Sequence, residues 1–111
     1  KNQSLFLVIG SPGGPTIINT VLQVILNLVD FNFAIQEAID APRVHHQWLP
    51  DELIVEHHGF AQDVIDGLRS RGHNVVVDGY LGDAEGILLN PRDHNLNGAS
   101  DPRGDGLTLG Y

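Results

Sequence analysis

Cysteine and methionine are both absent from this chain of 111 residues. Without cysteine, the chain cannot form a disulfide framework, use a thiol as a nucleophile or hold zinc through thiolates. Basic residues are scarce: the chain has 6 Lys and Arg and 14 Asp and Glu, which gives a formal net charge of −8. This balance argues against nucleic acid, whose phosphates require neutralisation by Lys and Arg, and against an anionic membrane surface. Since position 1 is not a methionine, we expect the sequence to begin inside a longer chain.

Long apolar runs are missing as well. The most apolar stretch, residues 17–29, is too short and too often interrupted by polar residues to cross a bilayer, so this segment is not expected to insert into a membrane. On a helical wheel its apolar residues fill about 200°, which predicts a core helix and indicates a covering surface outside this sequence. Its polar side chains fall in a stripe roughly 100° wide, which faces either solvent or polar groups of another layer and is formed by Thr16, Asn19, Thr20, Gln23, Asn27 and Asp30.

Apolar runs separated by turn residues predict a mixed α/β layer arrangement. Strands are expected over residues 5–9, 53–56, 75–77, 85–90 and 96–100, and helices over 17–29, 33–40 and 60–71. Residues 43–48 are expected to be extended, 49–52 and 91–95 to form turns, and the tail 101–111 to be irregular.

The run Gly10-Ser11-Pro12-Gly13-Gly14 lies where the first predicted strand leads into the first predicted helix. Unpaired N–H groups and the positive end of the helix dipole meet at such a point. The adjacent glycines let an oxygen approach those N–H groups without hindrance from a Cβ. The loop is therefore suited to an anion, or to an oxyanion formed during acyl transfer. It lacks the spacing of a P-loop or a dinucleotide fingerprint, and a tight turn without a ligand remains an alternative.

The histidines and Trp48 are interpreted as structural. His45-His46 and His57-His58 are adjacent pairs, and neighbours on a strand point to opposite faces. Each pair therefore offers at most one ligand to a given site, so no metal site is expected. Trp48 is expected to pack in the core.

Two sets of charged residues are expected to have structural roles. Asp51 and Glu52 are expected to cap a turn or to pair with Arg43. Asp101 and Arg103 are expected to form an ion pair near the C-terminus. Acid–base catalysis by two carboxylates would require them to meet in space, which the sequence does not show.

Several blocks of the sequence closely resemble the gamma-glutamyltranspeptidase family. They are residues 10–14 (GSPGG), 17–23 (IINTVLQ), 37–43 (EAIDAPR), 45–53 (HHQWLPDEL) and 98–103 (GASDPR). The resemblance runs from about residue 5 to residue 111. It identifies residues 1–111 as the C-terminal portion of that family's small subunit, a fragment of a single domain.

This resemblance implies a partial αββα sandwich of the N-terminal-nucleophile hydrolase type, with a mixed sheet and packed helices. In this family a precursor cleaves itself into a large and a small subunit and exposes an N-terminal threonine. The threonine hydroxyl attacks the γ-glutamyl amide of glutathione and related compounds, and its own α-amino group is the base. Water, an amino acid or a peptide then accepts the γ-glutamyl group. The family uses no cofactor, and its members are periplasmic or extracellular.

The resemblance also assigns roles within the glycine loop. The N–H groups of Gly13 and Gly14 would hold the oxyanion. Ser11 and Pro12 would shape the loop and, with the two glycines, bind the substrate. The threonine nucleophile, the residues that hold the glutamyl head group and the large subunit's arginine lie outside this sequence. The remainder of the small subunit and the large subunit are therefore the expected partners.

Alone, the chain is expected to be inactive and prone to self-association. Two alternatives remain: a stand-alone module that binds anions or a partner, and a related acylase that acts on another acyl group, such as a cephalosporin side-chain amide.

Overall fold

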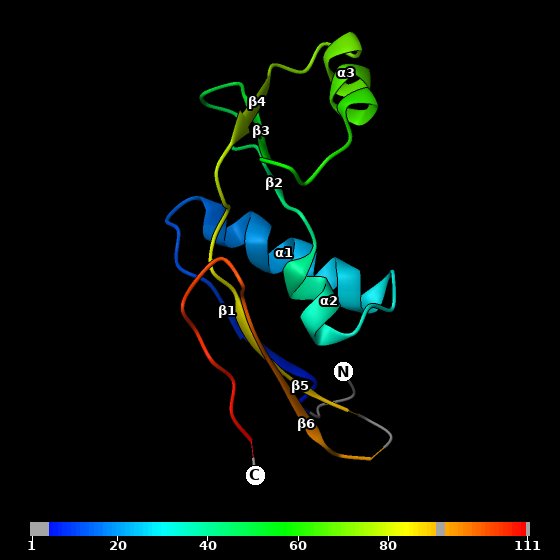
Figure 1. Cartoon of the computed structure of the whole chain (residues 1–111), viewed down its shortest axis with the longest axis vertical. Coiled ribbons are helices and arrows are strands. Elements are labelled where there is room, and N and C mark those ends of the chain that lie inside the picture. The colour runs from blue at the N-terminus through cyan, green and yellow to red at the C-terminus, as the bar shows by residue number, and fades with distance from the viewer. Residues whose placement is uncertain (1–4, 91–92, 111) are drawn as a thin grey trace.

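The computed structural model describes residues 5–90 and 93–110, which form two three-stranded sheets and three helices. The sheets lie at opposite ends of the long axis, with two of the helices between them (Figure 1). In chain order the elements are β1 (Leu7–Gly10), α1 (Thr16–Val29), α2 (Ile35–Asp40), β2 (Val44–His45), β3 (Leu53–Glu56), α3 (Gln62–Ser70), β4 (Val75–Asp78), β5 (Glu85–Leu89) and β6 (Leu96–Ser100).

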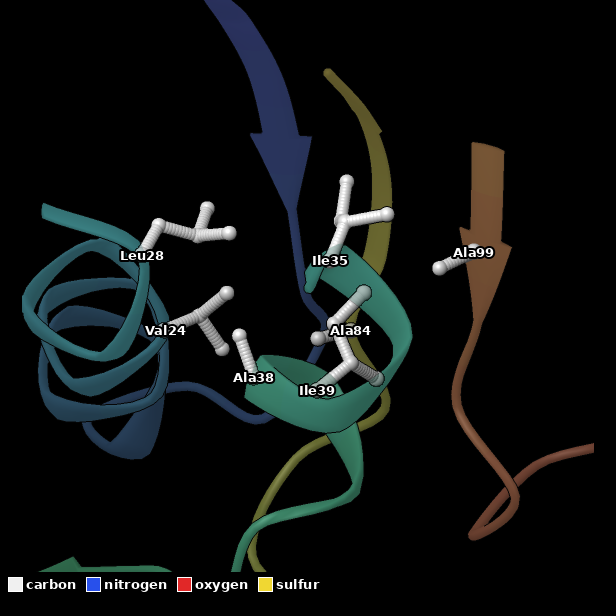
Figure 2. Packing of buried hydrophobic residues seen from close by; sticks show 7 residues of the cluster. All are labelled: Val24, Leu28, Ile35, Ala38, Ile39, Ala84 and Ala99. Atoms are coloured by element: carbon white, nitrogen blue, oxygen red, sulfur yellow. The ribbon is translucent and has the colours of Figure 1, made fainter. Parts of the chain in front are cut away.

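The first sheet has the strand order β1-β5-β6 and is antiparallel throughout. Period-two alternation turns Leu7 and Ile9 of β1 towards the helices and leaves Val8 exposed on the other face. α1 and α2 cover the inner face, and Figure 2 shows their buried side chains grouped with Ala84, just before β5, and Ala99 of β6. This core consists of Val24, Leu28, Ile35, Ala38, Ile39, Ala84 and Ala99.

The second sheet has the order β2-β3-β4, with β2 antiparallel and β4 parallel to β3. The crossover helix α3 packs on it through Ile65, which meets Val55 and Val75 in a separate buried cluster. The radius of gyration is 15.3 Å, larger than the roughly 13 Å expected of a compact domain of this length. The molecule is therefore elongated, and each sheet has its own small core.

The structure confirms the predicted elements, with differences at their ends. Most strand and helix bounds agree to within two residues, and β3 and β6 coincide with the predicted runs. The extended segment 43–48 contains only the two-residue strand β2. The predicted turn 91–95 falls partly on residues 91–92, outside the described residues, although the Asn90 N–H donates to the Asn95 carbonyl across it.

The predicted core helix α1 is buried only in part within this chain. Ile18 is 73% exposed, and Leu22 and Val29 are more than half exposed. The polar stripe instead faces the protein, because the Gln23 amide bonds both the N–H and the carbonyl of Val44 at 2.9 and 2.8 Å. The Asn27 amide similarly donates to the Ala38 carbonyl. Among residues 5–90 and 93–110, no helix has the length and apolar character needed to cross a membrane.

The prediction that Trp48 packs in the core is wrong. Its side chain is 75% exposed, and its backbone has a positive φ of 74°. The Trp48 N–H donates to Nδ1 of His46 at 3.1 Å. The tryptophan therefore lies in a tight surface turn rather than in either core.

Candidate active site

The glycine loop joins β1 to the N-terminus of the 14-residue helix α1. Gly13 has φ +132° and Gly14 φ +59°, and only glycine adopts the first of these without strain. The Thr16 N–H donates to the Gly13 carbonyl, and the Ile17 N–H to the Gly14 carbonyl, both at 3.2 Å. Within the described residues, neither Gly13 nor Gly14 uses its own N–H in a hydrogen bond. Two amide donors are thus available at the positive end of α1.

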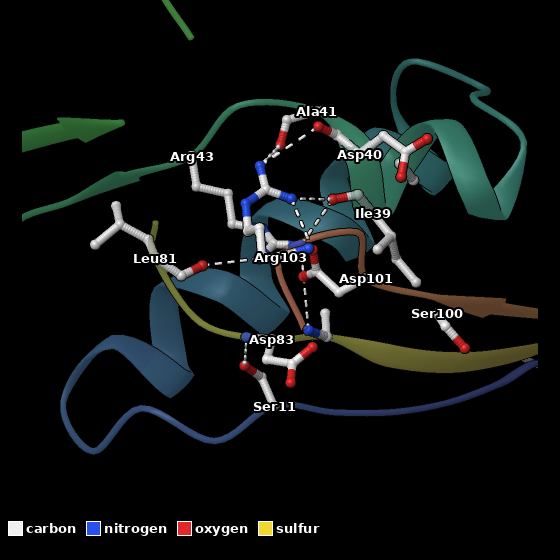
Figure 3. A network of polar contacts seen from close by, with 12 residues as sticks. Ser11, Ile39, Asp40, Ala41, Arg43, Leu81, Asp83, Ser100, Asp101 and Arg103 are labelled. Carbon is white, nitrogen blue, oxygen red and sulfur yellow. Dashed lines mark hydrogen bonds and ion pairs between the residues drawn. The ribbon is translucent and has the colours of Figure 1, made fainter. Parts of the chain in front are cut away.

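Ser11 anchors this loop to a segment 72 positions later in the sequence. Its Oγ accepts a hydrogen bond from the Asp83 N–H at 3.0 Å (Figure 3) and donates one to the Pro12 carbonyl at 2.8 Å. A Cβ on Gly82 would lie 2.7 Å from both the Ser11 Oγ and the Thr20 Oγ1. The two segments therefore approach each other closely, and a side chain on Gly82 would separate them.

Four charged side chains form a buried network beside this contact, and Figure 3 shows three of them, Arg43, Asp101 and Arg103. Arg43 pairs with Asp101 at 2.7 Å, and Arg103 pairs with Asp101 at 3.0 Å and with Glu56 at 2.6 Å. None of these side chains is more than 7% exposed. The predicted ion pair between Asp101 and Arg103 is confirmed. The predicted pairing of Arg43 with residues 51–52 is wrong, because Arg43 turns inward to Asp101 instead.

The network also fixes the backbone that holds Ser11. Glu56 accepts the N–H groups of Leu81 and Arg43 at 2.8 and 2.9 Å. Asp101 accepts the Ala84 N–H at 2.7 Å. The segment 81–84 is thus tied to charges from both sheets. The sequence analysis did not single out Glu56. The feature that could have revealed it is a carboxylate at the end of the otherwise apolar strand Leu53–Glu56.

The pKa of Glu56 is lowered, and the cause is its hydrogen bonding. Burial alone would raise this pKa, but hydrogen bonds from the Arg103 guanidinium and from two backbone N–H groups more than offset it. Asp101 follows the same pattern: burial acts to raise its pKa, and the Ala84 N–H and the arginines hold it below its ordinary value. Both groups are therefore carboxylates at neutral pH.

These lowered pKa values predict a loss of stability in acid. An unfolded chain protonates its carboxyl groups near pH 4, whereas Glu56 and Asp101 resist protonation in the folded chain. The unfolded state then binds more protons, so the stabilisation present above about pH 4 is lost as the pH falls through the lower folded values. We expect the melting temperature of the protein carrying this chain to fall steeply as the pH is lowered below about 5. Glu56→Gln should make that slope shallower, and an unchanged slope would contradict the assignment.

The histidines do not assemble into a site. His45 is buried and bonds Gln47 at 2.9 Å, while His46 pairs with Asp51 at 3.1 Å. The rings of His57 and His58 contact each other edge to face, with centroids 3.8 Å apart. In the part of the chain that the structure describes, no three acidic or histidine side chains gather as metal ligands.

Solved structures share the fold of this chain. A mutant of Helicobacter pylori gamma-glutamyltranspeptidase superposes with a TM-score of 0.89 and 48% identity, over 94% of this chain and 57% of that chain. The fold is therefore part of an N-terminal-nucleophile hydrolase, an αββα sandwich of which this chain supplies helices and strands.

The sequence comparisons specify the family. A family model described as Gamma-glutamyltranspeptidase matches residues 1–111. The chain is 48% identical to the glutathione hydrolase proenzyme of Escherichia coli K12 over 112 residues, which is all of this chain and 19% of that protein. It is 36% identical over 110 residues to the acylase ACY 1 proenzyme of Pseudomonas sp. strain V22, covering 98% of this chain and 19% of that protein. The chain belongs to the gamma-glutamyltranspeptidase family and spans about a fifth of the length of these relatives.

Proposed function

We propose that this chain is the C-terminal part of the small subunit of an enzyme that cleaves γ-glutamyl amides such as glutathione. The enzyme transfers the γ-glutamyl group to water or to an amino acid or peptide. The observation that carries this proposal is the pair of unused N–H groups, on Gly13 and Gly14, at the start of α1. The naming of the Escherichia coli relative as a glutathione hydrolase proenzyme supports the substrate class.

The proposed role of the loop is to stabilise charge. A threonine hydroxyl from the remainder of the small subunit attacks the γ-carbonyl carbon, and the threonine's α-amino group accepts the hydroxyl proton. The carbonyl oxygen becomes negative, and the N–H groups of Gly13 and Gly14 donate to it at the positive end of α1. When the tetrahedral intermediate collapses, the C–N bond breaks and the leaving amine takes the proton. Water or an acceptor amine then reverses these steps on the acyl enzyme.

Exposed apolar surfaces support the proposed partners. The outer face of the first sheet exposes Val8, Ile87 and Leu96, and the outer face of α1 exposes Ile18 and Leu22. Contiguous apolar surface of this kind marks an interface. We propose that the remainder of the small subunit and the large subunit cover these faces, and that the complete protein is periplasmic or extracellular.

The isolated chain provides a direct test. We expect residues 1–111 alone to show no turnover of a γ-glutamyl anilide, because the nucleophile lies elsewhere, whereas the complete matured protein turns it over. We also expect the isolated chain to elute from size-exclusion chromatography above the 12.1 kDa of a monomer, because its apolar faces associate. Turnover by the rigorously purified chain would refute the proposed mechanism, and a folded monomer at high concentration would refute the proposed coverage.

A different acyl substrate is the second candidate, and the similarity to the acylase ACY 1 proenzyme favours it. The same N–H pair would stabilise the oxyanion formed from any amide, so the loop does not choose between acyl groups. Comparing kcat/KM for a γ-glutamyl anilide and for a cephalosporin side-chain amide distinguishes the two. A larger value for the cephalosporin would favour the acylase.

A further inference from the structure

The two proposed oxyanion donors belong to two successive peptide units. The Gly13 N–H lies in the Pro12–Gly13 unit, and the Gly14 N–H lies in the Gly13–Gly14 unit. A trans peptide is planar, and its N–H and C=O point in opposite directions. A group that holds the carbonyl of such a unit therefore also sets the direction of its N–H.

Thr16 holds the carbonyl of the second unit. Its Oγ1 donates to the Gly13 carbonyl at 3.0 Å, and its own N–H donates to the same oxygen at 3.2 Å. The Thr16 hydroxyl occupies the space that a Cβ on Gly13 would need, so it fits only beside a glycine. With the carbonyl held towards the first turn of α1, the Gly14 N–H is directed away from that turn.

Ser11 holds the carbonyl of the first unit. Its hydroxyl donates to the Pro12 carbonyl at 2.8 Å, and the Asp83 N–H donates to its Oγ at 3.0 Å. The Ser11 hydroxyl therefore links the Pro12–Gly13 peptide unit to the segment 81–84, which Glu56 and Asp101 hold in place. This link fixes the direction of the Gly13 N–H. The hydroxyl of Ser11 is thus committed to the loop rather than to a ligand.

We propose that Thr16 and Ser11 are positioning residues, whose hydroxyls aim the Gly14 and Gly13 N–H groups at the oxyanion through the carbonyls of the same peptide units. This inference rests on the proposed function. Its physical basis is preorganisation: a donor already held in place needs no rearrangement when charge develops. Both hydroxyls donate to carbonyls of the loop, so we expect each to affect the transition state rather than substrate binding.

The test uses the complete matured protein and compares Thr16→Val with Thr16→Ser. Valine keeps the branched shape and loses the hydroxyl, whereas serine keeps the hydroxyl. We expect Thr16→Val to lower kcat for a γ-glutamyl anilide about tenfold, the scale of one lost hydrogen bond, and to leave KM within about twofold. Thr16→Ser should restore most of kcat. Affinity for a γ-boronic acid analogue of glutamate, which forms a tetrahedral anion with a hydroxyl, should fall in Thr16→Val in parallel with kcat.

Ser70→Ala is the matched control, because the Ser70 hydroxyl also donates to a glycine carbonyl three residues earlier, at 2.9 Å in α3. Its kcat should equal that of the wild type, and Ser11→Ala should repeat the loss in kcat seen for Thr16→Val. Maturation into two subunits and the melting temperature show that each variant folds. Wild-type kcat in Thr16→Val, or a Thr16→Ser as impaired as Thr16→Val, would overturn the positioning role while the proposed function stands. An inactive wild type would overturn the proposed function and this inference with it.

Discussion

Gly13→Ala is expected to lower kcat/KM of the complete protein for a γ-glutamyl anilide by at least about 100-fold, since the loss of even one oxyanion donor costs about 100- to 1000-fold. An alanine does not adopt φ +132° without strain, and its Cβ would collide with the Thr16 Oγ1. The Pro12–Gly13 and Gly13–Gly14 peptide units must then rotate, and both N–H groups leave their places. Steady-state kinetics on the matured protein measures this loss.

Gly72→Ala separates backbone strain from loss of the donors. Gly72 follows α3 with φ +95°, and a Cβ there would meet nothing within 4 Å. It should lower the melting temperature slightly and leave kcat/KM unchanged. Gly14→Ala is an intermediate case, because φ +59° lies in the left-handed region, at a cost of about 1 kcal/mol, and a Cβ there also meets open space. If Gly13→Ala kept wild-type kcat/KM, the loop would not be the oxyanion site.

Arg103→Met is expected to destabilise the protein by about 3–5 kcal/mol, the cost of leaving buried charges without their partner. The Arg103 guanidinium contacts both oxygens of Glu56, and it also bonds Asp101 and the carbonyls of Ile39 and Ala41. Methionine fills much of the volume but leaves the Glu56 carboxylate buried without a cation. Urea unfolding of the complete protein, followed by tryptophan fluorescence and by activity, measures the change.

Arg69→Met is the control for this substitution. Arg69 pairs with Asp66 at 3.6 Å on α3, and both side chains are about half exposed. An exposed pair contributes at most about 1 kcal/mol, so this variant should unfold close to the wild type. Equal destabilisation by the two substitutions would show that the buried network contributes no more to stability than an exposed ion pair.

The local elements were predictable because each depends on a short pattern. The apolar run at 53–56 and the amphipathic pattern at 60–71 became β3 and α3. The division of the strands between two sheets was not predictable from such patterns, since β1 pairs with β5, whose residues lie far along the chain. The helical wheel left open whether the polar stripe of α1 faces solvent or another layer, because it does not contain the contact of Gln23 with the backbone of Val44.

The candidate site was predictable only in part. The glycine loop was found because a strand, two glycines and a helix follow one another in the sequence. The convergence of the Gly13 and Gly14 N–H groups on one oxygen stays a prediction. The support beneath the loop was missed, because Ser11 meets Asp83 and Glu56 meets Arg103 only through the tertiary fold.

Pro15 limits the number of free N–H donors at the start of α1. A proline nitrogen carries no hydrogen. The next two N–H groups, of Thr16 and Ile17, already donate to the carbonyls of Gly13 and Gly14. Of the amides from Gly13 to Ile17, two are left over. Two donors match the two lone pairs of a single carbonyl oxygen. A phosphate or sulfate presents three or four oxygens, and most of them would have no hydrogen-bond donor here. From this count we expect the loop to suit one carbonyl oxygen that becomes an alkoxide better than a tetrahedral anion such as sulfate.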